Sequence, residues 1–199
     1  MTSSAAGFAD VKDWTRYYDA AGIDPRETLL DAVERFDEPG LAVDLGCGAG
    51  RDTFELLRRG WHVLAVDAQE EALRRLRAAV GGYERLETQV ATFDDAALPQ
   101  CDLVNASFSL PFCPPNRFDE LWSRIGDALR PGGRFCGQLF GERDGWSGNP
   151  SLTFHTRAEV DRLLAGYEAE RLDEEEEDST TVVGDAKHWH LFHVVARKR

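Results

Sequence analysis

The chain has 199 residues, of which 42% are hydrophobic, and this is enough for one domain that buries a core without disulfide support. Its formal net charge of -13 argues against a nucleic-acid partner, because binding to a phosphate polymer depends on clustered lysine and arginine. The sequence has no run of about eighteen apolar residues and no cationic, apolar leader. We therefore expect a soluble, cytoplasmic protein, a monomer or homodimer, whose partner is a small molecule and not a membrane.

Two helices are predicted ahead of the first strand. The second has Asp24 as its expected cap and Pro25 at its first helical position. The first carries three aromatic side chains at helical spacing: Trp14, Tyr17 and Tyr18. Such a stripe is more often core than pocket, but helices that precede the sheet are free to cover its open end. We expect residues 1–38 to form a helical lid, with a core position for the aromatics as the alternative.

Short apolar runs then alternate with amphipathic stretches, which predicts strand and helix units around a parallel sheet. Five strands are expected at residues 41–45, 62–66, 85–90, 102–107 and 134–140. Helices are expected at residues 51–59, 70–80 and 116–129, and a short one opens with a capping box at 156–159. A Pro-Gly-Gly turn at residues 131–133 is expected to end the third of these helices.

The end of the chain alternates differently. Residues 167–176 and 188–197 read as two strands joined by a polar loop, so they predict a hairpin whose last strand is antiparallel to the others. The acid run at 173–178 is interpreted as a solvated edge or loop, with a metal site as the less favoured alternative. The prediction is an α/β, Rossmann-like, doubly wound sheet of seven strands with helices on both faces, in one domain over 1–199 with its core at 39–199.

The four cysteines lie far apart and form no C-x-x-C pair that would indicate zinc or a redox site. We expect reduced, buried thiols and no metal. The four are Cys47, Cys101, Cys113 and Cys136.

The most distinctive segment is "VDLGCGAGRD" at residues 43–52, with three glycines in five positions after an acid-ended apolar run. A dinucleotide fold would have G-x-G-x-x-G, whose third glycine allows helix and strand to approach closely. Here Arg51 stands at that third position and the last glycine comes one residue early. A nicotinamide cofactor is therefore disfavoured.

Five segments in order carry a resemblance to a known family: "VDLGCGAGRD", "VLAVDA", "FDD", "CDLVNASF" and "LRPGG". Together they resemble the class I S-adenosylmethionine-dependent methyltransferases over nearly the whole chain. The segments "GAGRDT", "FGERDGW" and "KHWHLFHVVARK" are similar to the small bacterial enzymes grouped with tellurite-resistance and thiopurine methyltransferases. The resemblance implies S-adenosyl-L-methionine as cofactor and S-adenosyl-L-homocysteine as product.

The resemblance also implies a set of cofactor-binding residues. Asp44 would meet the methionyl ammonium, and Asp67 would accept the ribose hydroxyls unless it only caps the next helix. The chain departs from the family after the third strand, where Thr92 precedes Phe93, so Asp94 and a backbone carbonyl both stay candidates for the adenine amine. The full set is Asp44, Gly46, Cys47, Gly48, Gly50, Arg51, Asp67, Ala68, Thr92, Phe93, Asp94 and Ser107.

Ligands of open parallel sheets sit beyond the carboxyl ends of the strands, and an antiparallel last strand starts at that same edge. We expect the catalytic groups there to be Arg143, His188 and His190, with structural histidines and an Arg143–Asp144 pair as the alternatives. The expected acceptor contacts are Trp14, Tyr17, Tyr18, Phe108, Asp144, Trp146 and Trp189.

The expected reaction is methyl transfer by in-line displacement to a small molecule, which depends mainly on positioning. A soft sulfur, selenium or tellurium nucleophile is the first acceptor class considered. A natural-product oxygen or nitrogen acceptor is the second, and a cofactor-binding module without catalysis is the alternative from another functional class.

Overall fold

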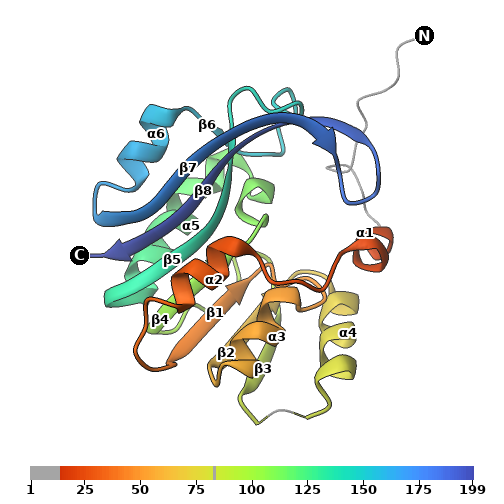
Figure 1. The fold of residues 1–199 in the computed structure, drawn as a ribbon, viewed down its shortest axis with the longest axis vertical. Coiled ribbons are helices and arrows are strands. Elements are labelled where there is room, and N and C mark those ends of the chain that lie inside the picture. The colour runs from red at the N-terminus through yellow and green to blue at the C-terminus, as the bar shows by residue number, and fades with distance from the viewer. Residues whose placement is uncertain (1–13, 83) are drawn as a thin grey trace.

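The protein is described from a computed structural model that covers residues 14–82 and 84–199. Its centre is an eight-stranded sheet in the order β3-β2-β1-β4-β5-β8-β7, with the short β6 paired to β5 (Figure 1). The strands are β1 (Leu41–Leu45), β2 (His62–Asp67), β3 (Leu86–Val90), β4 (Cys101–Ala106), β5 (Leu129–Gly141), β6 (Phe154–His155), β7 (Tyr167–Thr180) and β8 (Ala186–Lys198). As expected, β8 runs antiparallel to both of its neighbours, and the other pairings are parallel.

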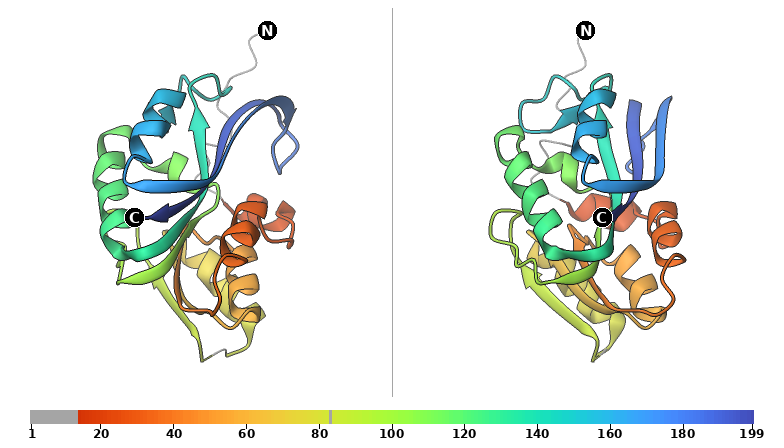
Figure 2. Two further views of the ribbon diagram at one scale, coloured as in Figure 1. Left: turned by 60° about the vertical axis from the view of Figure 1, so that its left-hand side comes forward. Right: turned by 90° about the vertical axis from the view of Figure 1, so that its left-hand side faces the viewer.

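Helices cover both faces of this sheet (Figure 2). They are α1 (Thr15–Ala20), α2 (Glu27–Val33), α3 (Arg51–Arg58), α4 (Glu70–Val80), η2 (Leu110–Phe112), α5 (Pro115–Ala128) and α6 (Arg157–Leu163). Buried side chains of α2, α3 and α4 belong to one apolar cluster, and those of α5 and α6 to another on the opposite face. The doubly wound α/β fold expected from the sequence is therefore confirmed.

Two of the expected boundaries are wrong. Helix α2 begins at Glu27 instead of Pro25, because Arg26 is extended and donates its backbone N–H to Asp52 Oδ1 at 2.9 Å. Strand β5 begins at Leu129, which pairs with Cys101, so no separate turn at residues 131–133 follows α5. In both places a contact made by a distant segment decides the local structure.

The β7–β8 hairpin is longer than expected and curves over the carboxyl end of the sheet toward α1 (Figure 1). Arg16 of α1 donates from Nη2 to the Val183 carbonyl at the tip of the hairpin, at 3.1 Å. The hairpin and α1 therefore meet above the edge where β1, β2 and β4 end. Within the described residues, no helix combines the length and apolar character that crossing a membrane requires.

Candidate functional site

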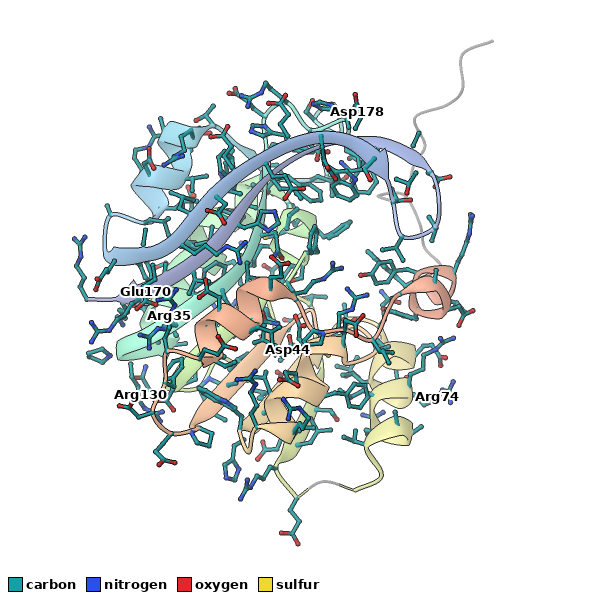
Figure 3. The ribbon with its side chains drawn as sticks, in the orientation of Figure 1. Arg35, Asp44, Arg74, Arg130, Glu170 and Asp178 are labelled. Carbon is teal, nitrogen blue, oxygen red and sulfur yellow. The ribbon has the colours of Figure 1, made fainter. Side chains whose placement is uncertain are left out.

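A cavity of about 1150 Å³ lies at the carboxyl ends of the central strands, below α1 and the hairpin. Asp44 lies near the middle of the molecule at the end of β1, and Asp178 lies on the outer side of the hairpin (Figure 3). Every residue assigned to the cofactor from the sequence lines this cavity except Gly50. Every expected acceptor contact lines it except Asp144.

The glycine-rich loop forms one end of the cavity. Gly46, Gly48 and Gly50 all have left-handed backbone angles, with φ of 76°, 54° and 98°, which side chains rarely adopt. The loop is tied to β2, because the N–H groups of Gly46 and Cys47 both donate to the Val66 carbonyl. Gly50 faces the other way, and a Cβ there would collide with the Leu76 side chain of α4. The structure therefore places Gly50 against α4 and not in the cavity wall, where the sequence had led us to expect it.

Asp67 holds the loop from the tip of β2. Its Oδ2 accepts the Gly48 N–H and its Oδ1 accepts the Gln69 N–H, each at 2.8 Å. Burial raises the pKa of this carboxyl group above its ordinary value, and the two backbone hydrogen bonds oppose that rise. Each carboxylate oxygen retains a second lone pair for a ligand hydroxyl. Asp67 thus orders the loop before helix α4 and lines the cavity as well.

Beneath the loop, two carboxylates share one amide. Asn105 Nδ2 donates to Asp44 Oδ1 at 2.9 Å and to Asp52 Oδ2 at 3.0 Å. Thr53 Oγ1 donates to the other oxygen of Asp44 at 2.5 Å. Burial and the nearby charge of Asp52 raise the pKa of Asp44 to about 7, against the effect of these donors. A cationic ligand group would lower that pKa and complete the charge balance.

The segment after β3 leaves one carboxylate for a ligand. Arg124 donates to the backbone carbonyls of Phe93 at 2.7 Å and of Asp94 at 3.2 Å. The Asp94 side chain takes one hydrogen bond from Arg117 Nε at 3.0 Å and still lines the cavity. The sequence left two candidates for the adenine amine, the Asp94 carboxylate and a backbone carbonyl. The carboxylate has more hydrogen-bonding capacity free, because Arg124 already binds the carbonyls of Phe93 and Asp94.

Helix α1 covers the loop. Trp14, Tyr17 and Tyr18 all line the cavity, and Tyr18 is also the buried residue of the helix. The Tyr18 ring lies over Gly48, and the Trp14 ring packs edge-on against Phe112 of η2 with centroids 5.2 Å apart. Burial of Tyr18 raises its pKa well above its ordinary value. The aromatic stripe is both packed and exposed to the cavity.

Arg26 is a site residue that the sequence analysis missed. Its guanidinium lies 4.4 Å from the centroid of the Phe108 ring and lines the cavity, and no carboxylate among the described residues lies within ion-pair distance of it. Burial, followed by the charge of Arg51, lowers its pKa. The signal lay in its position directly before α2, in the segment assigned to the lid.

Phe108 supports the same region from the end of β4. Among the described residues, Phe108 is the one non-glycine residue whose backbone φ angle is positive, at 53°. Its backbone N–H donates to Gln138 Oε1 at 3.0 Å. Gln138 is buried and donates from Nε2 to Thr28 Oγ1 at 3.0 Å. A strained backbone held by a buried side chain is typical of functional sites. The strain directs Phe108 into the cavity beside Arg26.

The other end of the cavity is aromatic. Trp189 lies within about 6 Å of three neighbouring rings, centroid to centroid, and Phe112 continues the wall from Phe140. The rings around Trp189 belong to Phe108, Phe140 and Trp146. Behind them Lys187 pairs with Asp144, and its Nζ lies 4.1 Å from the ring centroids of both Trp146 and Trp189. Asp144 is therefore a support for the wall, not a contact of the ligand.

The expected catalytic residues do not line the cavity, which corrects their assignment. Arg143 pairs with Glu174 and Glu176 at 3.0 and 2.8 Å, and His190 Nε2 lies 3.0 Å from Glu174 Oε1. His188 pairs with Asp178 and Glu176 in the same cluster, so all three lie on the outer face of the hairpin. The Arg143–Asp144 pair that was the alternative does not form either, since each of the two residues has another partner.

The reason for this displacement is the two-residue period of a strand. Residues 188 and 190 do share one face, as expected, but the cavity is lined by the alternate residues of β8, Trp189, Leu191 and His193. His193 Nε2 lies 2.9 Å from Glu175 Oε2 of β7, which also lines the cavity. The sequence did not identify His193 and Glu175 as site residues, because the two-residue period of a strand does not tell which of its faces lines the cavity.

The acid run is part of β7, an edge strand of the sheet. Among residues 14–82 and 84–199, no three histidine, cysteine, aspartate or glutamate side chains converge in a way that could hold a metal ion. The four cysteines are buried and free, as expected, and burial raises the pKa of each thiol.

Comparison with known families and proteins gives a consistent match to one kind of domain. Residues 42–133 match the family described as "Methyltransferase domain". A carboxy-S-adenosyl-L-methionine synthase of Aeromonas hydrophila is 35% identical over 97 residues, 45% of this chain and 39% of that protein. A trans-aconitate 2-methyltransferase of Rhodopseudomonas palustris is 31% identical over 118 residues, 58% of this chain and 44% of that protein. The chain thus matches less than half of the length of these relatives.

Solved structures share the fold over more of the chain. TehB from Haemophilus influenzae superposes with a TM-score of 0.75 at 17% identity, covering 87% of this chain and 62% of that one. The 1,6-didemethyltoxoflavin-N1-methyltransferase of Burkholderia thailandensis, solved with 1,6-didemethyltoxoflavin and S-adenosylhomocysteine, superposes with a TM-score of 0.67 at 24% identity. It covers 92% of this chain and 81% of that one. At these identities the likeness establishes the fold.

Proposed function

Since residues 42–133 match a methyltransferase domain and the fold is that of S-adenosylmethionine-dependent methyltransferases, we propose that this chain binds S-adenosylmethionine and methylates a small molecule. The observation that carries the proposal is one cavity that joins the glycine-rich loop and Asp67 to an aromatic chamber. Methyl transfer needs the donor and the nucleophile in contact, and a continuous cavity allows this.

The nucleoside end is supported by three side chains. Asp67 lines the cavity, and each of its carboxylate oxygens can accept one more hydrogen bond, which suits the two vicinal hydroxyls of a ribose. Phe93 lines the cavity and can lie against a purine ring. The Asp94 carboxylate is available for the adenine amine, because the neighbouring carbonyls are engaged by Arg124.

The amino-acid end is supported by two groups of opposite charge that both line the cavity. Asp44 is buried beneath the loop and matches the methionyl ammonium. Arg26 is a partly buried cation that forms no ion pair among the described residues, although the charge of Asp52 and a hydrogen bond with Tyr17 favour its charged form, and it matches the methionyl carboxylate. A ligand carboxylate at Arg26 would add a charge-assisted hydrogen bond in a partly buried place.

S-adenosylmethionine supplies a methyl group that is activated by its positively charged sulfur. The chain contributes positioning and exclusion of water. Tyr18 covers the loop, Phe108 is held in place by Gln138, and the hairpin closes the chamber from above. An in-line displacement asks for little more than this arrangement from the protein, unless the acceptor must lose a proton.

His193 is the residue placed to take such a proton. It lines the cavity, and Glu175 engages its Nε2, so Nδ1 is the ring nitrogen left for an acceptor group. Gln138 of β5 lies opposite His193 in the sheet and connects it to Phe108. His193 therefore replaces His188 and His190 as the proposed proton acceptor.

Two acceptor classes differ in the charge they require. Sulfur, selenium or tellurium nucleophiles that arrive as anions would need a free cation in the aromatic chamber. Lys187 is paired with Asp144 there, and His193 with Glu175. Arg26, stacked on Phe108, is the partner of the methionyl carboxylate in this proposal, so the chamber supports an uncharged nitrogen or oxygen nucleophile better than an anionic one. The alternative of a binding module without catalysis is disfavoured because the chamber is open to the cofactor end.

Calorimetry with S-adenosylhomocysteine and with NAD tests the cofactor, and incubation with methyl-labelled S-adenosylmethionine and a panel of amines, phenols, thiols, selenite and tellurite tests the reaction. We expect S-adenosylhomocysteine to bind, NAD not to bind, and a labelled product to form from an amine or phenol. Tight NAD binding without S-adenosylhomocysteine binding would refute the proposal. Binding without turnover of any acceptor would favour the non-catalytic alternative.

A further inference from the structure

The two faces of strand β7 differ in how their acids are balanced. Glu174, Glu176 and Asp178 lie on the outer face, and each has a basic partner there. These partners are Arg143, His188 and His190. The alternate residues Glu175 and Glu177 line the cavity. The negative charges on the outer face of the hairpin are therefore balanced by basic side chains.

On the inner face of the hairpin, one of the two glutamates has no basic partner among the described residues. Glu175 is engaged by His193 at 2.9 Å. Glu177 makes no hydrogen bond or ion pair within the described part of the chain, and it lies directly opposite Trp189 in the hairpin. Glu177 therefore projects a free negative charge beside the aromatic wall.

No cation of the described residues forms an ion pair with it. Arg51 also lines the cavity, but it donates from Nε to the Gly22 carbonyl at 2.7 Å. Lys187 is buried, pairs with Asp144 and lies behind the Trp146 and Trp189 rings. The Arg26 guanidinium stacks on the Phe108 ring of the wall, and it forms no ion pair with Glu177. The chamber thus combines electron-rich ring faces with a net negative charge, and both attract a cation.

We propose that the methyl acceptor is a flat molecule that carries a cationic group, such as a protonated amine, and that Glu177 binds this group while the aromatic wall binds the ring. The inference rests on the proposed function and specifies its substrate class. The cationic group serves recognition, and the atom that receives the methyl group is a separate, uncharged one with a lone pair. An anionic acceptor of similar shape is repelled by the same carboxylate.

The test uses three small probes of similar shape: phenethylamine, 2-phenylethanol and 3-phenylpropionate, which are cationic, neutral and anionic near pH 7. Each is titrated into the full-length protein saturated with S-adenosylhomocysteine, and binding is followed by saturation-transfer difference NMR. We expect the amine to bind at least about fivefold more tightly than the anion, the scale of one exposed ion pair. Glu177→Gln should remove most of that preference.

Asp178→Asn is the matched control, since it removes one charge from the neighbouring residue on the outer face and should leave the preference unchanged. Equal or tighter binding of the anion, an unchanged preference in Glu177→Gln, or no saturable amine binding would overturn the inference. The outcome is separable from the proposed function, because binding of S-adenosylhomocysteine is measured first. Its failure to bind refutes the methyltransferase proposal, whereas its binding without an amine preference refutes only the substrate class.

Discussion

Asp44 and Asp52 are held by the same donor, the Nδ2 group of Asn105, at 2.9 and 3.0 Å. The two carboxylates come from the end of β1 and the first turn of α3, on either side of the glycine-rich loop. Their proximity and burial raise the pKa of Asp44 to about 7. If the proposed methionyl ammonium binds at Asp44, the protonation of Asp44 and that binding are linked.

The first prediction concerns pH. If the ammonium requires ionised Asp44, affinity for S-adenosylhomocysteine should rise by about tenfold from pH 6 to pH 8, since a group with a pKa of about 7 is mostly protonated at the lower value. The free protein should show the opposite trend. The native carboxyl group holds its proton where the unfolded one has lost it, so stability falls as pH rises toward 7. Calorimetry and thermal melts measure the two trends.

Asp52→Asn should move both trends to lower pH, because it removes the like charge next to Asp44. Asp31→Asn, which removes a partly exposed acid of α2, is a suitable control. A flat affinity between pH 6 and pH 8 in the parent protein would separate Asp44 from the ammonium site.

The second prediction concerns Arg26. Arg26→Met should weaken S-adenosylhomocysteine binding by about 1.5 to 3 kcal/mol, the scale of a hydrogen bond to a charged group, because the methionyl carboxylate loses its partner. Arg26→Lys should recover only part of that loss, since a lysine lacks the planar fork. The free Arg26→Met protein should melt only slightly lower than the parent, because the stacking on Phe108 and the hydrogen bond with Tyr17 are lost while a partly buried charge is removed. A much lower melting temperature with unchanged affinity would make Arg26 structural.

The third prediction concerns Asp67. Asp67→Ala should weaken S-adenosylhomocysteine binding by about 1.5 to 3 kcal/mol in calorimetry. Asp67→Asn keeps one acceptor for the backbone N–H groups of the loop and separates the ribose contact from loop order. Circular dichroism checks that both variants are folded. If Asp67→Ala binds as tightly as the parent protein, the ribose assignment is wrong.

The fourth prediction concerns the lid. Tyr18→Ala removes the ring that covers Gly48 and should weaken S-adenosylhomocysteine binding by about 1 to 2 kcal/mol, in proportion to the apolar area it exposes. Tyr18→Phe keeps the ring and should bind as the parent does. Stopped-flow dissociation should be faster in the alanine variant alone. Unfolding of Tyr18→Ala would instead make the aromatic stripe part of the core.

The fifth prediction contrasts two histidines of β8. His193→Ala should lower turnover of an acceptor that loses a proton while S-adenosylhomocysteine affinity stays within about twofold, because the group acts on the acceptor only. His188→Ala should leave turnover unchanged, since His188 lies on the outer face. Loss of turnover in His188→Ala with full activity in His193→Ala would reverse the assignment.

Replacing His188 should instead change the thermal stability of the protein. Hydrogen bonds with Asp178, then Glu176, raise its pKa above the ordinary histidine value. Its contribution is therefore complete below that ordinary value and is lost as pH rises through the raised one. The melting temperatures of the parent and His188→Ala should differ at pH 6 and converge at pH 9.

Much of the fold followed from the sequence, and so did most of the residues that line the glycine-rich end of the cavity, because local chemistry decides them. Helix α4 has the expected bounds, since two glycines follow it and its apolar residues repeat every three to four positions. The loop of Gly46 and Gly48 and the carboxylate of Asp67 depend on backbone angles and on short sequence distances. The antiparallel last strand followed from the absence of a helix between the last two strands.

The acceptor end depended on tertiary structure. Strand periodicity showed that His188 and His190 share a face, but only the packing of β8 between β5 and β7 decides that the cavity lies on the face of Trp189 and His193. Glu177 became significant because no described residue pairs with it, and Arg26 because it stacks on Phe108 inside the cavity; both relationships are visible only when distant segments are brought together. Sequence spacing fixes which residues are neighbours along an element, whereas the charge balance of a cavity is a sum over elements that the fold alone assembles.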